Sequence, residues 1–66
     1  MQFTAVLSPA SEGGYTAFNP ETGTTSQGET TEEALANLRE AVELYLEEFP
    51  RKFDGAAIVT SFNIAA

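Results

Sequence analysis

The feature that most constrains this chain is a single amphipathic helix-forming stretch in its second half. Thr30 and Glu33 have the spacing of a capping box, in which the Thr30 hydroxyl accepts from the Glu33 amide and the Glu33 carboxylate reaches back to the Thr30 amide. Arg39 is placed to pair with Glu43 on the charged face. The apolar face, which ends at Pro50, recurs at steps of three and four residues: Ala34, Leu35, Leu38, Ala41, Val42, Tyr45, Leu46 and Phe49. One helix is therefore predicted, and it must pack its apolar stripe against another element.

The remaining segments have the patterns of strands and turns. Residues 2–8 alternate apolar and polar side chains, residues 13–14 are a Gly-Gly turn, and residues 15–19 are typical of a returning strand. Residues 24–27 are β-branched and polar, which indicates a strand at or near an edge of the sheet, or one that lines an interface. Residues 56–64 alternate again and predict a last strand, with Ile58, Phe62 and Ile64 on one side. We expect a single α+β domain over residues 1–66, in the order β-β-β-α-β, whose antiparallel sheet is covered on one face by the helix.

The charge balance bears on the partners of the chain. Three basic residues against ten acidic ones give a formal net charge of −7. Such a field opposes phosphate backbones and anionic lipids, so we expect no direct binding of nucleic acid or membrane, whereas a basic protein would be attracted. Simple solubility is the alternative reason for this acidity. The sequence has no leader-like start and no apolar run near the ~20 residues of a membrane span, so we expect a cytoplasmic protein.

The residues that most enzymes use are scarce. The sequence has no Cys and no His, which removes disulfides, thiolate and imidazole metal ligands, and the commonest nucleophiles and bases. Its acids lie in predicted turns or on the helix instead of converging from strands, as a metal site requires. Glu21 and Glu29 would form a glycosidase pair only in a deep pocket, which a short chain hardly offers. We therefore predict no catalytic, cofactor-binding or metal site, and a role that is not enzymatic.

Association with another chain is the remaining way to stabilise so small a hydrophobic core. A chain of this size buries only about 60% of its unfolded surface, and it lacks disulfides. Tyr15 and Phe18 point to opposite faces of their strand, so one of them leaves the helix-covered side and can anchor a partner. An edge strand also invites pairing. We expect a homodimer or a higher homo-oligomer.

Several short motifs, taken in order, resemble the N-terminal domain of HicB antitoxins over residues 2–49. The motifs are Gly13-Gly14-Tyr15, Pro20-Glu21, Ser26-Gln27-Gly28-Glu29-Thr30, Glu32-Glu33-Ala34-Leu35 and Glu43-Leu44-Tyr45-Leu46. The resemblance implies a partial ribonuclease H-like fold that has lost its catalytic acids. It also implies that the chain neutralises a small basic HicA-type toxin, which cleaves messenger RNA, by covering its active site. The predicted partner-binding residues are Tyr15, Phe18, Glu21, Ser26, Gln27 and Glu29.

A second interpretation stays open beside the antitoxin. Full-length HicB antitoxins commonly carry a C-terminal segment that binds the operator, whereas this sequence ends at Ala66, so we expect no C-terminal DNA-binding domain here. The alternative is a solitary oligomeric scaffold or ligand-binding module of the same fold, without a toxin partner. The glutamate-rich helix face is likewise either a solvated surface or a docking surface for basic side chains.

Overall fold

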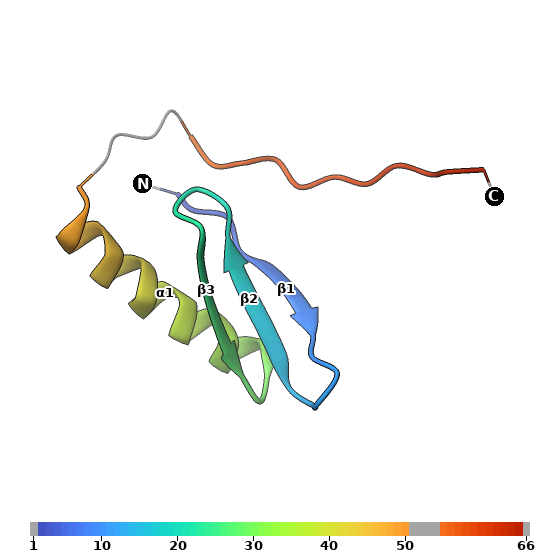
Figure 1. Cartoon of the computed structure of the whole chain (residues 1–66), viewed down its shortest axis with the longest axis horizontal. Helices are drawn as coiled ribbons and strands as arrows, with labels where there is room; N and C mark the ends of the chain where they lie inside the picture. The colour runs from blue at the N-terminus through green and yellow to red at the C-terminus, as the bar shows by residue number, and fades with distance from the viewer. Residues whose placement is uncertain (1, 51–54, 66) are drawn as a thin grey trace.

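A three-stranded antiparallel meander with one helix across one face forms the body of the protein (Figure 1). The computed structural model describes residues 2–50 and 55–65. Strands β1 (Val6–Pro9), β2 (Tyr15–Asn19) and β3 (Thr24–Gly28) precede helix α1 (Thr31–Glu48). The predicted α+β class is confirmed, and β3 is an edge strand, as its polar sequence indicated.

At the start of α1, one of the two hydrogen bonds of the predicted capping box is formed. Thr30 is extended, with φ −123° and ψ 165°, and its hydroxyl oxygen accepts from the Glu33 amide at 3.1 Å. The Glu33 carboxylate accepts from the Glu29 amide at 2.9 Å instead of the Thr30 amide, so the reciprocal bond is displaced by one residue. At the other end, the Phe49 amide donates to the Tyr45 carbonyl at 2.8 Å.

The core is small and lies between α1 and the two strands β2 and β3. Ala34, Leu38 and Val42 are four residues apart, so they share one side of α1, and together with Ala17 they are the buried apolar residues of the described chain. Gly28 allows a close approach of the helix, since a Cβ at that position would lie 2.5 Å from the Ala34 amide nitrogen. Consequently α1 packs mainly over β3 and β2, and scarcely over β1.

The strand register decides which side chains face the helix. Phe18 pairs with Val6 on β1 and with Thr25 on β3, while its neighbour Ala17 is buried beneath α1. Because successive side chains of a strand point to opposite faces, Phe18 leaves the covered side, where it is 41% exposed. Tyr15 packs against the core. The prediction that one of these two aromatic residues leaves the core is confirmed.

The predicted last strand is not formed. Residues 56–64 follow an extended path away from the sheet and pair with no strand of the described chain (Figure 1). An alternating pattern shows which side of a strand can be buried, but it does not provide the paired edge that a strand needs. The described order is therefore β-β-β-α, which corrects the predicted β-β-β-α-β, while the ribonuclease H-like relationship stays a prediction.

Candidate protein-binding surfaces

A buried polar cluster closes β2 and ties it to the N-terminal segment. Asn19 is fully buried, and its side-chain amide donates to the Thr4 carbonyl at 2.8 Å and to Glu21 Oε1 at 2.6 Å. The amide oxygen accepts from the Thr22 backbone amide at 2.9 Å and from the Thr22 hydroxyl at 2.6 Å. Both donor and both acceptor positions of the side chain are therefore used.

The carboxylate of Glu21 joins this cluster to the C-terminal part of the chain. It accepts from the Thr4 amide at 2.8 Å, from the Thr4 hydroxyl at 2.7 Å and from the Ala57 amide. We call Thr4, Glu21 and Ala57 the clasp. Desolvation acts to raise the pKa of Glu21, but the hydrogen bonds from Ala57, Thr4 and Asn19 outweigh it and lower the pKa from 4.5 to about 2. Glu21 is therefore an ionised structural group at neutral pH, engaged within its own chain.

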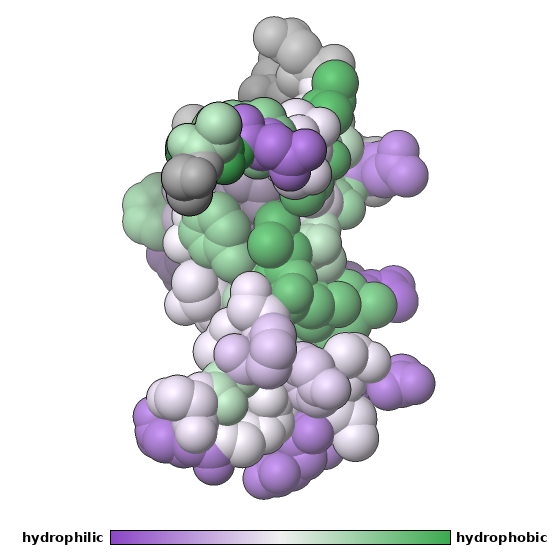
Figure 2. Space-filling view, turned by 90° about the vertical axis from the view of Figure 1, so that its right-hand side faces the viewer, coloured by the Kyte–Doolittle hydropathy of each residue, from purple (hydrophilic) through white to green (hydrophobic). Residues whose placement is uncertain are grey.

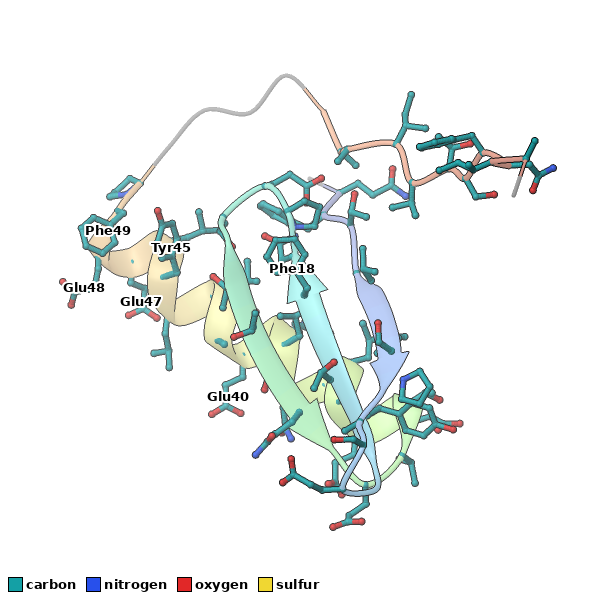
Figure 3. The ribbon with its side chains drawn as sticks, turned by 45° about the vertical axis from the view of Figure 1, so that its right-hand side comes forward. Phe18, Glu40, Tyr45, Glu47, Glu48 and Phe49 are labelled. Atoms are coloured by element: carbon teal, nitrogen blue, oxygen red, sulfur yellow. The ribbon has the colours of Figure 1, made fainter. Side chains whose placement is uncertain are left out.

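No helix or strand of the described residues covers the face of the sheet opposite α1. Phe18 stands between its cross-strand neighbours Val6 and Thr25, and Figure 3 shows its ring over the sheet with α1 behind. Thr16 and Gln27, which pair with each other, are exposed and continue this face toward the end of the hairpin. We call Val6, Thr16, Phe18, Thr25 and Gln27 the open sheet face. It offers one aromatic anchor within a β-branched and polar surround.

The six predicted partner-binding residues do not gather in one place. Phe18 and Gln27 lie on the open sheet face, whereas Ser26 is half-buried on the helix side and Glu21 belongs to the clasp. Three of the six, namely Tyr15, Gln27 and Glu29, border a polar hollow of about 360 Å³ at the hairpin end. Of the six, only Phe18 and Gln27 therefore share a broad exposed surface.

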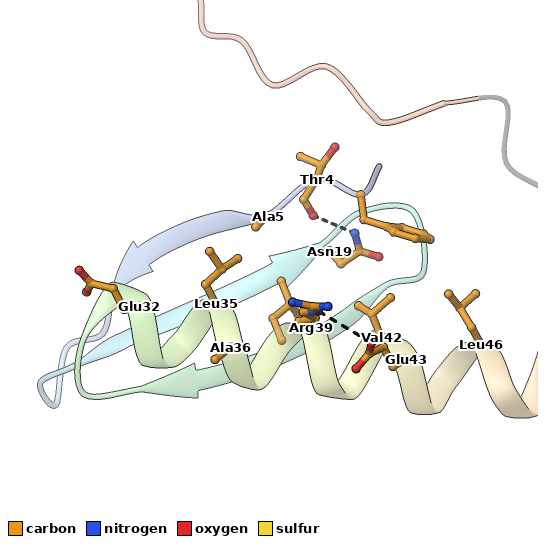
Figure 4. Close-up of a pocket in the computed structure, with 12 residues that line it drawn as sticks. Thr4, Ala5, Asn19, Glu32, Leu35, Ala36, Arg39, Val42, Glu43 and Leu46 are labelled. Carbon is orange, nitrogen blue, oxygen red and sulfur yellow. Dashed lines mark hydrogen bonds and ion pairs between the residues drawn. The ribbon is translucent and has the colours of Figure 1, made fainter. Parts of the chain in front are cut away.

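An open hollow lies between α1 and residues 3–5, which lead into β1 (Figure 4). Its volume is about 770 Å³. Its apolar lining includes Leu35, Val42 and Leu46 from the helix and Phe3 and Ala5 from the N-terminal segment, and charged side chains of the helix, Glu32, Arg39 and Glu43, also line it. We call it the β1 groove. Figure 2, which views the molecule from the β1 side, shows hydrophobic surface gathered in a band above the more polar hairpin end.

The β1 groove was missed at the level of sequence because the whole apolar stripe of the helix was assigned to the core. In the structure, Leu38 is buried between the helix and the sheet, whereas Leu35 is 47% exposed. Because α1 lies over β3 and β2, the sheet covers only part of the apolar stripe of the helix. The rest of the stripe stays open on the β1 side. The width of that stripe was the signal that could have indicated the groove.

The outer side of α1 is acidic. Glu40, Glu47 and Glu48 are exposed and project from the helix (Figure 3). The predicted pair of Arg39 and Glu43 is confirmed, with 3.8 Å between Arg39 Nε and a Glu43 carboxylate oxygen. Within residues 2–50 and 55–65, Arg39 is the only basic side chain, so the other helix carboxylates have no ion-pair partner there. This side favours basic groups on a partner.

In residues 2–50 and 55–65, no three His, Cys, Asp or Glu side chains are grouped so as to hold a metal ion. No helix in this part of the chain combines the length and the apolar character that crossing a bilayer requires.

Comparison with known proteins identifies the family. A family of unknown function, DUF7387, matches residues 5–64. The chain belongs to this family. The DUF7387 match covers the sheet, the helix and the extended residues 56–64, so that last segment is part of the family domain.

Homologues of this DUF7387 chain are UPF0150 proteins. One from Synechocystis sp. is 50% identical over 46 residues, which are 68% of this chain and 58% of the relative. A second from the same organism is 42% identical over 48 residues, or 71% of this chain and 67% of the relative. One from Helicobacter pylori is 58% identical over 36 residues, or 53% of this chain and 50% of the relative. The chain thus spans 50% to 67% of the length of these relatives. No solved structure matches it.

Proposed function

We propose that this chain is a non-catalytic binding module that acts as an antitoxin of the HicB kind in the cytoplasm. It binds a small basic toxin that cleaves messenger RNA and covers the active site of that toxin. The observation that carries the proposal is the open sheet face, where Phe18 is exposed between Val6 and Thr25. An exposed aromatic side chain within a rim of small and polar residues is typical of the centre of a protein interface.

The charge of the chain supports a basic partner. The net charge is −7, and the exposed carboxylates of Glu40, Glu47 and Glu48 add a local negative field along α1. Such a field accelerates association with a basic protein and disfavours RNA, the substrate with which this chain would compete. The attraction weakens as salt is added.

The state of Glu21 supports a role without catalysis. Its carboxylate accepts hydrogen bonds from Thr4, Asn19 and Ala57, and its pKa is lowered to about 2. A general acid for glycoside hydrolysis needs a raised pKa instead. Glu21 is thus committed to holding the fold. The ordered HicB-like motifs of residues 2–49 give the proposal its toxin class.

The test is co-expression of the chain with a small basic toxin-like protein encoded beside it. We expect rescue of growth and a complex that co-purifies. The Phe18→Ala variant should bind at least about tenfold more weakly, since interface anchors of this kind cost 2 kcal/mol or more when truncated, roughly thirtyfold. Leu44→Ala is the matched control, because Leu44 is an apolar side chain 58% exposed on α1, away from the sheet.

The outcomes separate the parts of the proposal. Absence of both rescue and complex would overturn the antitoxin function. If Phe18→Ala binds like the unmodified chain while Leu44→Ala weakens binding, the toxin contacts the acidic side of α1 and not the open sheet face. Far-UV circular dichroism of both variants checks that neither change alters the fold.

A second candidate function is a solitary oligomeric scaffold or ligand-binding module of the same fold. The β1 groove supports it, because an apolar hollow of about 770 Å³ is not used by a toxin bound at the open sheet face. Stable self-association, together with failure to bind any neighbouring basic protein, would favour this candidate.

A further inference from the structure

Residues 56–64 form an exposed apolar segment, which we call the C-terminal segment. Ile58 is 91% exposed, Phe62 85% and Ile64 79%. In an extended chain, alternate side chains share one side, so these three lie together, while Val59, Ser61 and Asn63 lie on the other. Large apolar side chains exposed in a row mark a surface that another element covers.

The clasp fixes the base of this segment to its own chain. The Ala57 amide donates to the Glu21 carboxylate, and the Ala57 carbonyl oxygen lies 3.0 Å from the Thr4 hydroxyl oxygen. Beyond Ala57, the segment runs away from the sheet and from its own groove (Figures 1 and 4). Residues 58–65 are all exposed. The chain thus presents the segment outward from a fixed point and does not lay it on its own body.

The β1 groove is complementary to this segment. Strand β1 is an edge strand whose outer backbone groups are not paired with another strand of the described chain. A strand added at this edge would point one row of side chains into the groove, toward Leu35, Val42 and Leu46, and the other row toward the open sheet face. One row of the segment carries Ile58, Phe62 and Ile64 and suits the groove. The other, more polar row mixes Val59 with Ser61 and Asn63, as the open sheet face mixes apolar and polar side chains.

The lengths also agree. Nine extended residues span about 30 Å at ~3.3 Å per residue, which is enough to follow the whole of β1 and the N-terminal residues before it. The match to the family extends through residue 64, so groove and segment belong to the same domain.

We propose that the β1 groove is occupied by the C-terminal segment of a second copy of this chain. Each copy has one groove and one segment, so a reciprocal exchange closes into a two-fold symmetric dimer and leaves neither apolar surface exposed. The exchanged segment adds a fourth strand to the sheet of its partner. The pairing predicted from the alternation of residues 56–64 is then made between chains. This inference does not depend on the toxin-binding function.

The test is sedimentation velocity of the full chain from low to high micromolar concentration. We expect a dimer, and we expect Phe62→Asp to raise its dissociation constant about a hundredfold or more, because both copies lose a buried aromatic side chain. The matched control is Asn63→Asp, which adds the same charge to the polar row and should change the constant only a few-fold. Phe62 is 85% exposed in the single chain, so the change leaves the fold of the chain intact.

Mixing two variants identifies the occupant. A Phe62→Asp chain keeps its groove, and a Leu35→Asp chain keeps its segment. Each should be largely monomeric alone, and the mixture should form a heterodimer through the one intact groove and segment. A monomer at all concentrations overturns the proposal, as does a monomer in which nuclear Overhauser contacts place Phe62 on Leu35 of its own chain. A dimer that survives Phe62→Asp, or that Asn63→Asp disrupts equally, also overturns it.

Discussion

Replacing Asn19 with alanine is a direct test of the polar cluster that closes β2. The change removes four hydrogen bonds, two to Thr22, one to the Thr4 carbonyl and one to Glu21, at distances from 2.6 to 2.9 Å. At about 0.5–1.5 kcal/mol for each bond, the sum is about 2–6 kcal/mol. Thr4 and Thr22 are half-buried and recover part of this from water, which places the expected loss at about 2–4 kcal/mol.

That loss is large for this chain. A domain of 66 residues has a free energy of unfolding of about 3–10 kcal/mol. The matched control is Asn37→Ala, because Asn37 makes a single exposed bond to the Gln27 carbonyl at 2.8 Å. Alanine is also the better helix former, so this control should lie within about 1 kcal/mol of the unmodified chain.

The assay is urea denaturation followed by far-UV circular dichroism, with all chains at one concentration so that self-association contributes equally. A markedly lower midpoint for Asn19→Ala than for Asn37→Ala is the expected result. If both variants lie within about 1 kcal/mol of the unmodified chain, the reasoning from buried hydrogen bonds is wrong.

Two further predictions concern the packing of α1 and the clasp. Gly28→Ala would place a Cβ 2.5 Å from the Ala34 amide nitrogen, so we expect the free energy of unfolding, measured by urea denaturation, to fall by about 2–3 kcal/mol. The exposed control Thr25→Ala should lose less than about 1 kcal/mol. Equal midpoints for the two variants would contradict the close approach. Because the pKa of Glu21 is lowered from 4.5 to about 2, its contribution to stability is fully present above pH 4.5 and is lost as the pH falls toward 2. The Glu21→Gln variant should flatten the dependence of unfolding free energy on pH in this window, and an unchanged slope would contradict the assignment.

The parts of the fold that were predictable from the sequence are those fixed by neighbouring residues. The Thr30 cap and the Arg39–Glu43 pair each depend on positions three or four residues apart, and both are found. The strand alternation correctly indicated that Tyr15 and Phe18 face opposite ways. That one of these two aromatic residues leaves the core was therefore predictable from the sequence, whereas the structure identifies it as Phe18.

The parts that were not predictable depend on contacts between distant segments. The clasp joins Thr4, Glu21 and Ala57, which are separated by 17 and 36 positions along the chain, and no local pattern announces it. The pairing of residues 56–64 failed as a prediction for the same reason, since alternation does not name the neighbouring strand. The β1 groove results from the position of α1 over β3. Gly28 permits this close packing, and sequence periodicity does not specify it.

Because α1 packs mainly on β3 and β2, the parts of the domain differ in local stability. The helix, β3 and β2 bury one another around Leu38 and form a unit of short sequence separation, whereas β1 is attached mainly through its ladder to β2. Regions with few buried apolar contacts open at lower free energy than the rest of a domain. Amide hydrogens of β1 should therefore exchange with solvent before those of β2, β3 and α1. The strand that follows the groove-lining residues 3–5 is thus the one whose backbone becomes available while the remainder of the domain stays folded.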